Sequence, residues 1–211
     1  MSDDQRRFAA SAGNNLPHIL KVLARHVPAT GDALEIASGT GQHIAAFAAA
    51  HPGIHWQASE RDPANFASIR AWAAQRPTPN LRAPVELDAA QRGWSAAHSH
   101  QALIIMANIL HLVTTSAAEI ILSETAKALA AGGVLLVYGP FLREGQTTSA
   151  GDAQFDASLR AQDPAIGYKD LDWVYAQLAL AQLTVQTEAM PANNLMLIAR
   201  KAVAPPDPSY R

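Results

Sequence analysis

The chain has 211 residues, of which 49% are hydrophobic and 16% charged, and its formal net charge is −2. This length and composition predict one soluble globular domain and argue against disorder. The nearly neutral charge gives no electrostatic reason to expect binding to nucleic acid or to an anionic membrane. The absence of cysteine excludes a disulfide framework, a thiolate metal site and a cysteine nucleophile.

The two ends of the sequence carry few structural signals. The opening residues, MSDDQRRF, are too polar and charged for a secretory signal, and no apolar stretch is long enough to span a bilayer. The expected location is therefore the cytoplasm. We expect residues 1–201 to form a single domain and residues 202–211 to form a flexible, proline-rich tail.

Between these ends, segments of helical and strand character alternate. Periodicity and turn residues predict strands at 33–37, 54–60, 83–88, 101–108 (fully apolar), 133–140, 183–190 and 194–200. They predict helices within 16–27, at about 40–50, from Pro63 through 75, at about 116–130 and at about 170–182. The helix at about 116–130 is expected to stop at Gly132-Gly133. The last two strands are joined by a link short enough for an antiparallel hairpin. Five β-α units followed by a hairpin predict an α/β fold with a mostly parallel sheet and one reversed strand.

The stretch ALEIASGTGQH, residues 33–43, places a glycine-rich turn after the first strand. Ligands of open α/β sheets bind beyond the carboxyl ends of the strands, and glycine lets a ligand approach the backbone. A P-loop is excluded, because no lysine follows the turn before Lys127. A nicotinamide or flavin cofactor is disfavoured, because a dinucleotide fingerprint needs a small residue at position 44, which is Ile.

S-adenosylmethionine fits the same turn better. Its usual signature is an acid two positions before a small residue that starts Gly-x-Gly, and the segment from Glu35 to Gly41 matches with Ala37 in the first glycine slot. The Glu35 carboxylate would accept the ammonium of the cofactor. The predicted cofactor-binding residues of this turn are Glu35, Ala37, Ser38, Gly39, Thr40 and Gly41. The alternative is an ordinary β-turn-α unit whose acid caps nearby amides.

Two further acids lie at predicted strand ends. Glu60 ends the second strand, where a carboxylate accepts hydrogen bonds from ribose hydroxyls, and Asp62 competes for that role. Arg61, beside Glu60, is assigned to the same site. Asp88 ends the third strand, where the adenine amino group would lie. Three acids at three successive strand ends make a methyltransferase the leading hypothesis.

The chain also resembles the methyltransferase-like 26 family, known too as domain of unknown function 938, from about Phe8 to Arg200. The stretches that carry the resemblance are LEIASGTGQH, WQASERD, SIRAW, NLRAPVELD, NILHL, LVYGPF, FDASLRAQDP and MPANNLMLIAR. The resemblance implies a Rossmann-like class I methyltransferase fold with a seven-stranded sheet in the order 3-2-1-4-5-7-6. It implies S-adenosylmethionine as cofactor and supplies no acceptor.

This sequence departs from the family pattern where the acceptor is expected, at Asn14-Asn15, after NILHL, at Thr147-Thr148 and at Gly151-Asp152. Because of these departures the identity of the methyl acceptor is undecided between a small metabolite and a protein side chain. The same departures support a second hypothesis, in which the protein is a cofactor-binding module without turnover. A nicotinamide-dependent oxidoreductase is a third hypothesis and rests on shared sheet architecture alone.

Asn108 and His111, after the fourth strand, are the candidate catalytic residues. Asn108 would orient the acceptor or hold the methionine end of the cofactor, and His111 would act as a general base. The alternative for His111 is a structural helix-cap network. The other histidines lack ligand spacing, so no metal site is predicted. The stretch FDASLRAQDP resembles a cover over the acceptor, and its Asp156–Arg160 pair is typical of simple helix support.

Overall fold

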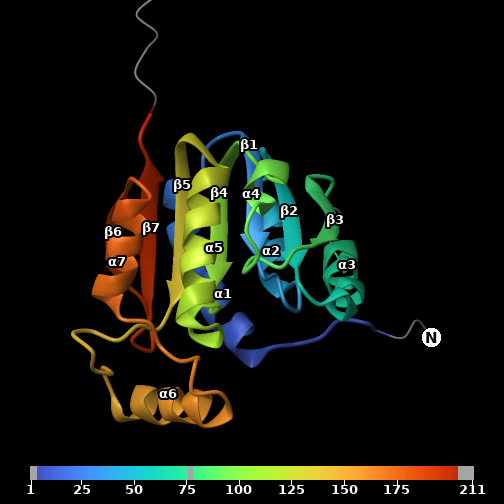
Figure 1. Cartoon of the computed structure of the whole chain (residues 1–211). Coiled ribbons are helices and arrows are strands. Elements are labelled where there is room, and N and C mark those ends of the chain that lie inside the picture. Colours follow the sequence, from blue (N-terminus) through green and yellow to red (C-terminus); the bar gives the residue numbers. More distant parts are fainter. Residues whose placement is uncertain (1–3, 76–77, 204–211) are drawn as a thin grey trace, which may run out of the picture.

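The computed structural model describes residues 4–75 and 78–203. Its sheet has seven strands in the order β3 (Leu81–Glu86), β2 (Ile54–Glu60), β1 (Gly31–Ile36), β4 (Gln101–Ala107), β5 (Leu129–Gly139), β7 (Leu195–Lys201) and β6 (Leu183–Ala189) (Figure 1). Within this sheet β7 is antiparallel to β5 and to β6, and the other pairs are parallel. The predicted α/β fold, strand order and reversed strand are confirmed.

Helices connect the strands and cover both faces of the sheet. They are α1 (Ala10–His26), α2 (Gln42–Ala50), α3 (Phe66–Gln75), α4 (Trp94–Ala97), α5 (Thr115–Ala128), α6 (Ala150–Gln162) and α7 (Leu171–Leu180), with short 3-10 turns η1 (Pro63–Asn65) and η2 (Leu110–Leu112). Figure 1 shows α6 beyond the ends of the strands, apart from the helices on the sheet faces. None of the helices in the described residues is both long and apolar enough to cross a membrane. Of the predicted tail, residues 204–211 lie outside the described residues.

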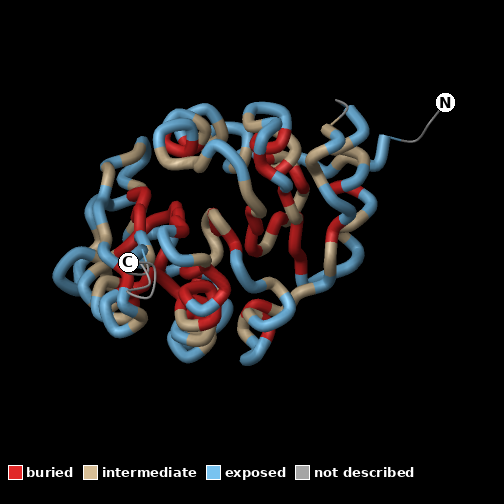
Figure 2. Tube along the Cα trace, turned by 90° about the horizontal axis from the view of Figure 1, so that it is seen from above, coloured by how far each residue is buried: buried red, intermediate tan, exposed pale blue. Residues whose placement is uncertain are grey.

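The core has two layers because successive residues of a strand point to opposite faces of the sheet. In β4, Leu103 and Ile105 pack in the cluster that contains side chains of α1, α2 and α3. Ile104 and Met106 pack in the cluster that contains side chains of α4, α5 and α7. Buried residues accordingly follow the strands and the inward sides of the helices (Figure 2). A strand covered on both faces is apolar at nearly every position, as β4 is.

Several predicted boundaries differ from the structure: α1 begins at Ala10 and not at residue 16, β3 covers Leu81–Glu86 and not 83–88, and the end of α5 is displaced. The helix expected to run to residue 130 and to stop at Gly132-Gly133 ends at Ala128, and β5 begins at Leu129 and contains both glycines. Leu129 pairs with Gln101 of β4. The Lys201 ammonium, at the end of β7, donates to the carbonyls of Ala126 and Leu129 and so satisfies the end of the helix.

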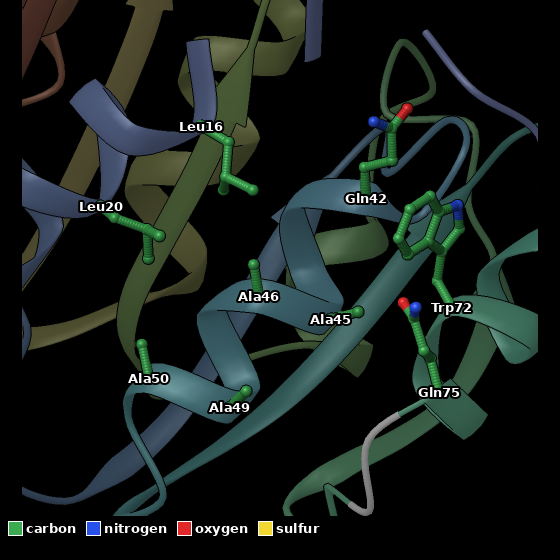
Figure 3. A pocket seen from close by; sticks show the side chains of 9 residues that line it. All are labelled: Leu16, Leu20, Gln42, Ala45, Ala46, Ala49, Ala50, Trp72 and Gln75. Carbon is green, nitrogen blue, oxygen red and sulfur yellow. The ribbon is translucent and has the colours of Figure 1, made fainter. Parts of the chain in front are cut away.

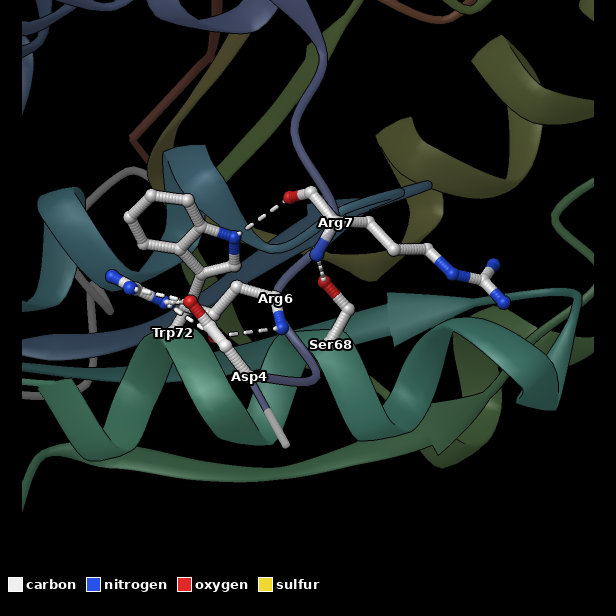
Figure 4. A network of polar contacts seen from close by, with 5 residues as sticks. All are labelled: Asp4, Arg6, Arg7, Ser68 and Trp72. Carbon is white, nitrogen blue, oxygen red and sulfur yellow. Dashed lines mark hydrogen bonds and ion pairs between the residues drawn. The ribbon is translucent and has the colours of Figure 1, made fainter. Parts of the chain in front are cut away.

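The segment before α1 is attached to α3 (Figure 4). The Arg7 backbone N–H donates to the Ser68 hydroxyl over 2.8 Å, and the Trp72 indole N–H donates to the Arg7 carbonyl over 3.0 Å. The Ala9 N–H then donates to the side-chain oxygen of Gln42 over 2.6 Å. These bonds fix the start of α1 beside the start of α2, where the glycine-rich turn ends.

Candidate functional site

The glycine-rich turn connects β1 to α2 and is bonded to the end of β2. The Ser59 hydroxyl donates to the Glu35 carbonyl over 2.6 Å, and the Ser38 N–H donates to the Ser59 carbonyl over 2.8 Å. The Gly39 N–H donates to Glu60 Oε2 over 2.8 Å. The structure therefore brings Glu60 together with the predicted turn residues, across two neighbouring parallel strands.

Glu35 is a buried acid beneath this turn. Its side chain is 2% exposed, and its Oε2 has no hydrogen-bond partner among the described residues. Burial raises the pKa of Glu35 to about 8, and the negative charge of Glu60 acts in the same direction. Buried polar groups are normally hydrogen-bonded, so an unpaired carboxyl oxygen at a strand end indicates unused binding capacity.

The two glycines of the turn have different surroundings. Gly41 has φ +89°, and a Cβ there would lie 2.6 Å from Ile69 Cα, so this glycine permits close packing of the turn on α3. Gly39 has φ +53°, and a Cβ there would meet no atom within 4 Å. The turn is consequently packed on its Gly41 side and open on its Gly39 side.

The other predicted cofactor-site residues follow the ends of β2 and β3. Glu60 is 8% exposed, whereas Arg61 is exposed. The Asp62 carboxylate accepts a hydrogen bond from the backbone N–H two residues later and so caps η1. Asp88 lies beyond β3, which ends at Glu86, and caps its own turn in the same way. The predicted third strand therefore ends earlier than expected, and Asp62, although one of its oxygens caps η1, stays a predicted competitor of Glu60 for the ribose.

Strained backbone marks the ends of the two central strands. Ala37, after β1, has φ 56°, and Asn108, after β4, has φ 58°. Left-handed φ values in residues other than glycine cost energy and gather at functional sites. The Asn108 N–H donates to the Tyr138 carbonyl of β5 over 2.8 Å, which fixes this conformation. β1 and β4 are parallel neighbours, so both strained residues lie side by side at the carboxyl ends of the strands.

A pocket of about 480 Å³ lies beside Asn108. We call it the acceptor pocket. Its lining residues come from α1, the loop after β4, the end of β5, α6, the loop between α6 and α7, and the β6–β7 turn. They are Ser11, Asn14, Asn15, Asn108, His111, Leu112, Pro140, Asp152, Phe155, Tyr168, Ala192 and Asn194. The two candidate catalytic residues therefore share one cavity.

His111 is a buried imidazole, 5% exposed, in an aromatic cluster. Its ring centroid is 5.8 Å from that of Phe155 and 5.9 Å from that of Tyr168. Burial lowers the pKa of His111 to about 4, and the positive charge of Lys169 adds to this effect. The imidazole is consequently neutral near pH 7 and has a free lone pair.

The cover predicted from FDASLRAQDP is α6. Asp156 is buried and does more than pair with Arg160, because its Oδ1 accepts the Tyr168 N–H over 2.6 Å. Asp152 accepts hydrogen bonds from the Asn193 amide over 3.1 Å and, over a longer 3.4 Å, from the Tyr168 hydroxyl. These bonds tie α6 to two separate parts of the chain, the loop before α7 and the β6–β7 turn, both of which contribute to the lining of the pocket.

A second groove, of about 410 Å³, is lined by side chains of α1, α2 and α3 (Figure 3). Its lining is mostly leucine and alanine, with Trp72 and two glutamines, and includes no ionisable side chain among the described residues. It therefore offers no acid, base or nucleophile. Nor do the described residues contain a group of three or more His, Asp or Glu side chains that could hold a metal ion.

Sequence reasoning missed several residues of the acceptor pocket. Ser11, Tyr168 and Asn194 lie far apart in the chain and follow no spacing pattern. The one available signal was the departure from the family pattern at Asn14-Asn15 and at Gly151-Asp152, since Asn14, Asn15 and Asp152 all line the cavity.

Comparison with known proteins gives a family. The family described as "Protein of unknown function (DUF938)" matches residues 6–201. The chain belongs to this family. The DUF938 part of the resemblance noted above is thus confirmed, whereas the name methyltransferase-like 26 stays a prediction.

Several solved structures with a similar fold are methyltransferases. An O-methyltransferase family protein from Burkholderia thailandensis has a TM-score of 0.78 at 16% identity, covering 92% of the DUF938 chain and 57% of its own. Human N-acetylserotonin methyltransferase in complex with SAM has a TM-score of 0.73 at 15% sequence identity, and the match covers 92% of the DUF938 chain and 53% of the human chain. The mitomycin 7-O-methyltransferase MmcR has a TM-score of 0.75 at 18% sequence identity, and the match covers 92% of the DUF938 chain and 56% of MmcR. These likenesses show the fold, and the chain spans little more than half the length of these proteins.

Proposed function

We propose that the protein is an S-adenosylmethionine-dependent methyltransferase whose acceptor binds in the acceptor pocket. The observation that carries the proposal is the buried, unpaired carboxyl oxygen of Glu35 beneath a turn that is open at Gly39. The similar fold of human N-acetylserotonin methyltransferase, solved in complex with SAM, supports it.

The residues around the turn fit this cofactor. Glu35 offers its free oxygen to the ammonium group, and the open side of Gly39 leaves room for the ligand against the backbone. Glu60 stands at the end of β2, where ribose hydroxyls are expected, and Asp88 follows β3, where the adenine is expected. When bound, the cofactor supplies a methyl carbon on a positively charged sulfur.

Asn108 and His111 would act on the acceptor. Methyl transfer has a good, neutral leaving group, so the protein mainly positions and desolvates the nucleophile. The Asn108 amide, at the strained end of β4, would orient the acceptor, and the neutral His111 imidazole would take its proton. A cofactor-binding module without turnover would use the same turn and leave His111 idle.

The first test is calorimetric titration with S-adenosylmethionine, S-adenosylhomocysteine and, as a control, NADH. We expect micromolar binding of the first two and none of NADH. Gly39→Leu should abolish binding. Gly145→Leu is the matched control, because Gly145 also has positive φ (+74°) with no atom near its Cβ position, but lies in the loop after β5. Equal loss in both variants, or preference for NADH, would refute the proposal.

Turnover is tested separately with cofactor labelled in the methyl group and a small-molecule extract. Label transferred to an acceptor by the wild type and lost in His111→Ala supports an enzyme. Cofactor binding with no transfer to any extract would favour the binding module.

A further inference from the structure

The acceptor pocket has a distinctive charge. Among the described residues that line it, Asp152 is the one carboxylate, and none is Lys or Arg. His111 adds no positive charge near neutral pH, because burial lowers its pKa. The nearby Lys169 ammonium is occupied, since it donates to the carbonyls of Val113 and Gly167, each over 2.8 Å. A phosphate or carboxylate in this cavity would be desolvated without a counter-charge from any lining side chain, which is costly.

The pocket also presents apolar surface that nothing in the described chain covers. Leu112 is 51% exposed and Phe155 is 45% exposed, and both line the cavity. The Phe155 ring packs edge-to-face against Tyr168, at 6.1 Å between centroids. A cluster of rings with an open side offers edge-to-face or offset stacking to one more flat ring.

The remaining polar groups are mostly side-chain amides. Asn14 and Asn15 come from α1, Asn108 from the end of β4 and Asn194 from the β6–β7 turn. An amide both donates and accepts hydrogen bonds without a net charge, so this set suits hydroxyl and carbonyl groups. The volume of about 480 Å³ is in the usual range for small-molecule sites.

We propose that the acceptor is a small molecule with a flat, uncharged ring that carries the reacting hydroxyl, held between Phe155, Leu112 and the amide side chains. The pocket rejects phosphorylated and carboxylated molecules. This inference rests on the proposed function and names its acceptor class.

The reaction balances with residues already in the cavity. The hydroxyl oxygen would form a bond to the methyl carbon that the bound cofactor supplies, and the electron pair of the broken carbon–sulfur bond would stay on the sulfur. The hydroxyl proton passes to the His111 imidazole and then to water. Because burial makes His111 a weak base, the hydroxyl that it deprotonates must itself be acidic, and a hydroxyl on an aromatic ring is more acidic than an alkyl hydroxyl.

The test is calorimetry on the full chain saturated with S-adenosylhomocysteine, using probes that share one ring system. The probes are 2-naphthol, 2-naphthyl phosphate and 2-naphthoate, with 2-decalinol as a hydroxyl compound of similar size that is not flat. We expect 2-naphthol to bind at least about tenfold more tightly than each of the others, which corresponds to about 1.4 kcal/mol.

Phe155→Ala should weaken 2-naphthol binding about tenfold and leave the affinity for S-adenosylhomocysteine unchanged. Leu180→Ala is the control, because Leu180 is also an exposed large side chain but lies on α7, outside the pocket. Equal binding of the anions or of 2-decalinol, or equal effects of the two variants, would overturn this inference and leave the methyltransferase proposal standing. Failure to bind S-adenosylhomocysteine would overturn the methyltransferase proposal itself.

Discussion

The Glu35 carboxyl shows how a single residue can join a sequence motif to a measurable property. Its position before the glycine-rich turn is visible in the sequence, and that position predicts a ligand-binding acid. The sequence does not reveal that its Oε2 is buried without a partner, because the atoms that enclose it come from several strands. Its raised pKa therefore had to come from the structure.

We expect Glu35→Gln to stabilise the ligand-free protein at alkaline pH. The pKa of Glu35 rises from 4.5 to about 8 on folding, so the folded state keeps a proton that the unfolded chain releases. The free energy of unfolding of the wild type should thus fall between pH 4.5 and pH 8, by on the order of a few kcal/mol.

Urea denaturation at pH 5 and pH 8.5 measures this difference. Glu35→Gln should lack this decrease, whereas the exposed Glu119→Gln should behave like the wild type. If the free energy of unfolding of Glu35→Gln fell with pH as much as that of the wild type, the raised pKa could not belong to Glu35.

The two turn glycines give a second residue-scale prediction. Gly41→Ala should lower the free energy of unfolding by about 2–4 kcal/mol, because it adds a clash with Ile69 to an unfavourable φ. Gly39→Ala has only the backbone strain and should cost about 1–2 kcal/mol. Chemical denaturation of both variants decides the point, and equal losses would show that Gly41 has no packing role.

Among the elements, α6 is the one whose function depends most on contacts distant in sequence. The Asp156–Arg160 pair was expected to be simple helix support, yet Asp156 also accepts the Tyr168 N–H. Asp156→Ala leaves that buried N–H unpaired, at a cost of about 1–3 kcal/mol. Hydrogen exchange of α6 amides should accelerate more in Asp156→Ala than in Arg160→Ala, and the reverse order would contradict this role.

The boundary between α5 and β5 shows what local sequence cannot supply. Gly132-Gly133 is a normal stop signal, but the helix had already ended at Ala128. The group that satisfies its last carbonyls is the Lys201 ammonium, which arrives from the last strand. The continuous apolar run of β4 is therefore readable from the sequence, whereas a helix end that is fixed by a distant side chain is not.

Across the whole molecule, a second buried acid should govern stability at low pH. Glu124 is 1% exposed and accepts hydrogen bonds from the Gly93 N–H, the Ser95 hydroxyl and the Lys127 ammonium. Although burial opposes ionisation, these donors lower the pKa of Glu124 to about 2.

Glu124 therefore stabilises the fold above pH 4.5, and this contribution should disappear as the pH falls from 4.5 towards 2. Glu124→Gln should be less stable than the wild type at pH 6, by about 1–3 kcal/mol, and should lose less stability on acidification. Acid titration followed by circular dichroism compares the two proteins. An acid transition of unchanged steepness in Glu124→Gln would argue against this role.

The order of the strands has a consequence for how the chain is made. β1 lies in the middle of the sheet, and its Ala33 pairs on one side with Trp56 but on the other with Leu103. A chain emerging from the ribosome therefore completes β1, β2 and β3 while the backbone N–H and C=O groups on the β4 side of β1 still have no partner. Unpaired strand edges of this kind promote aggregation. Nascent chains that stop after β3 should be chaperone clients, and release should coincide with the appearance of β4.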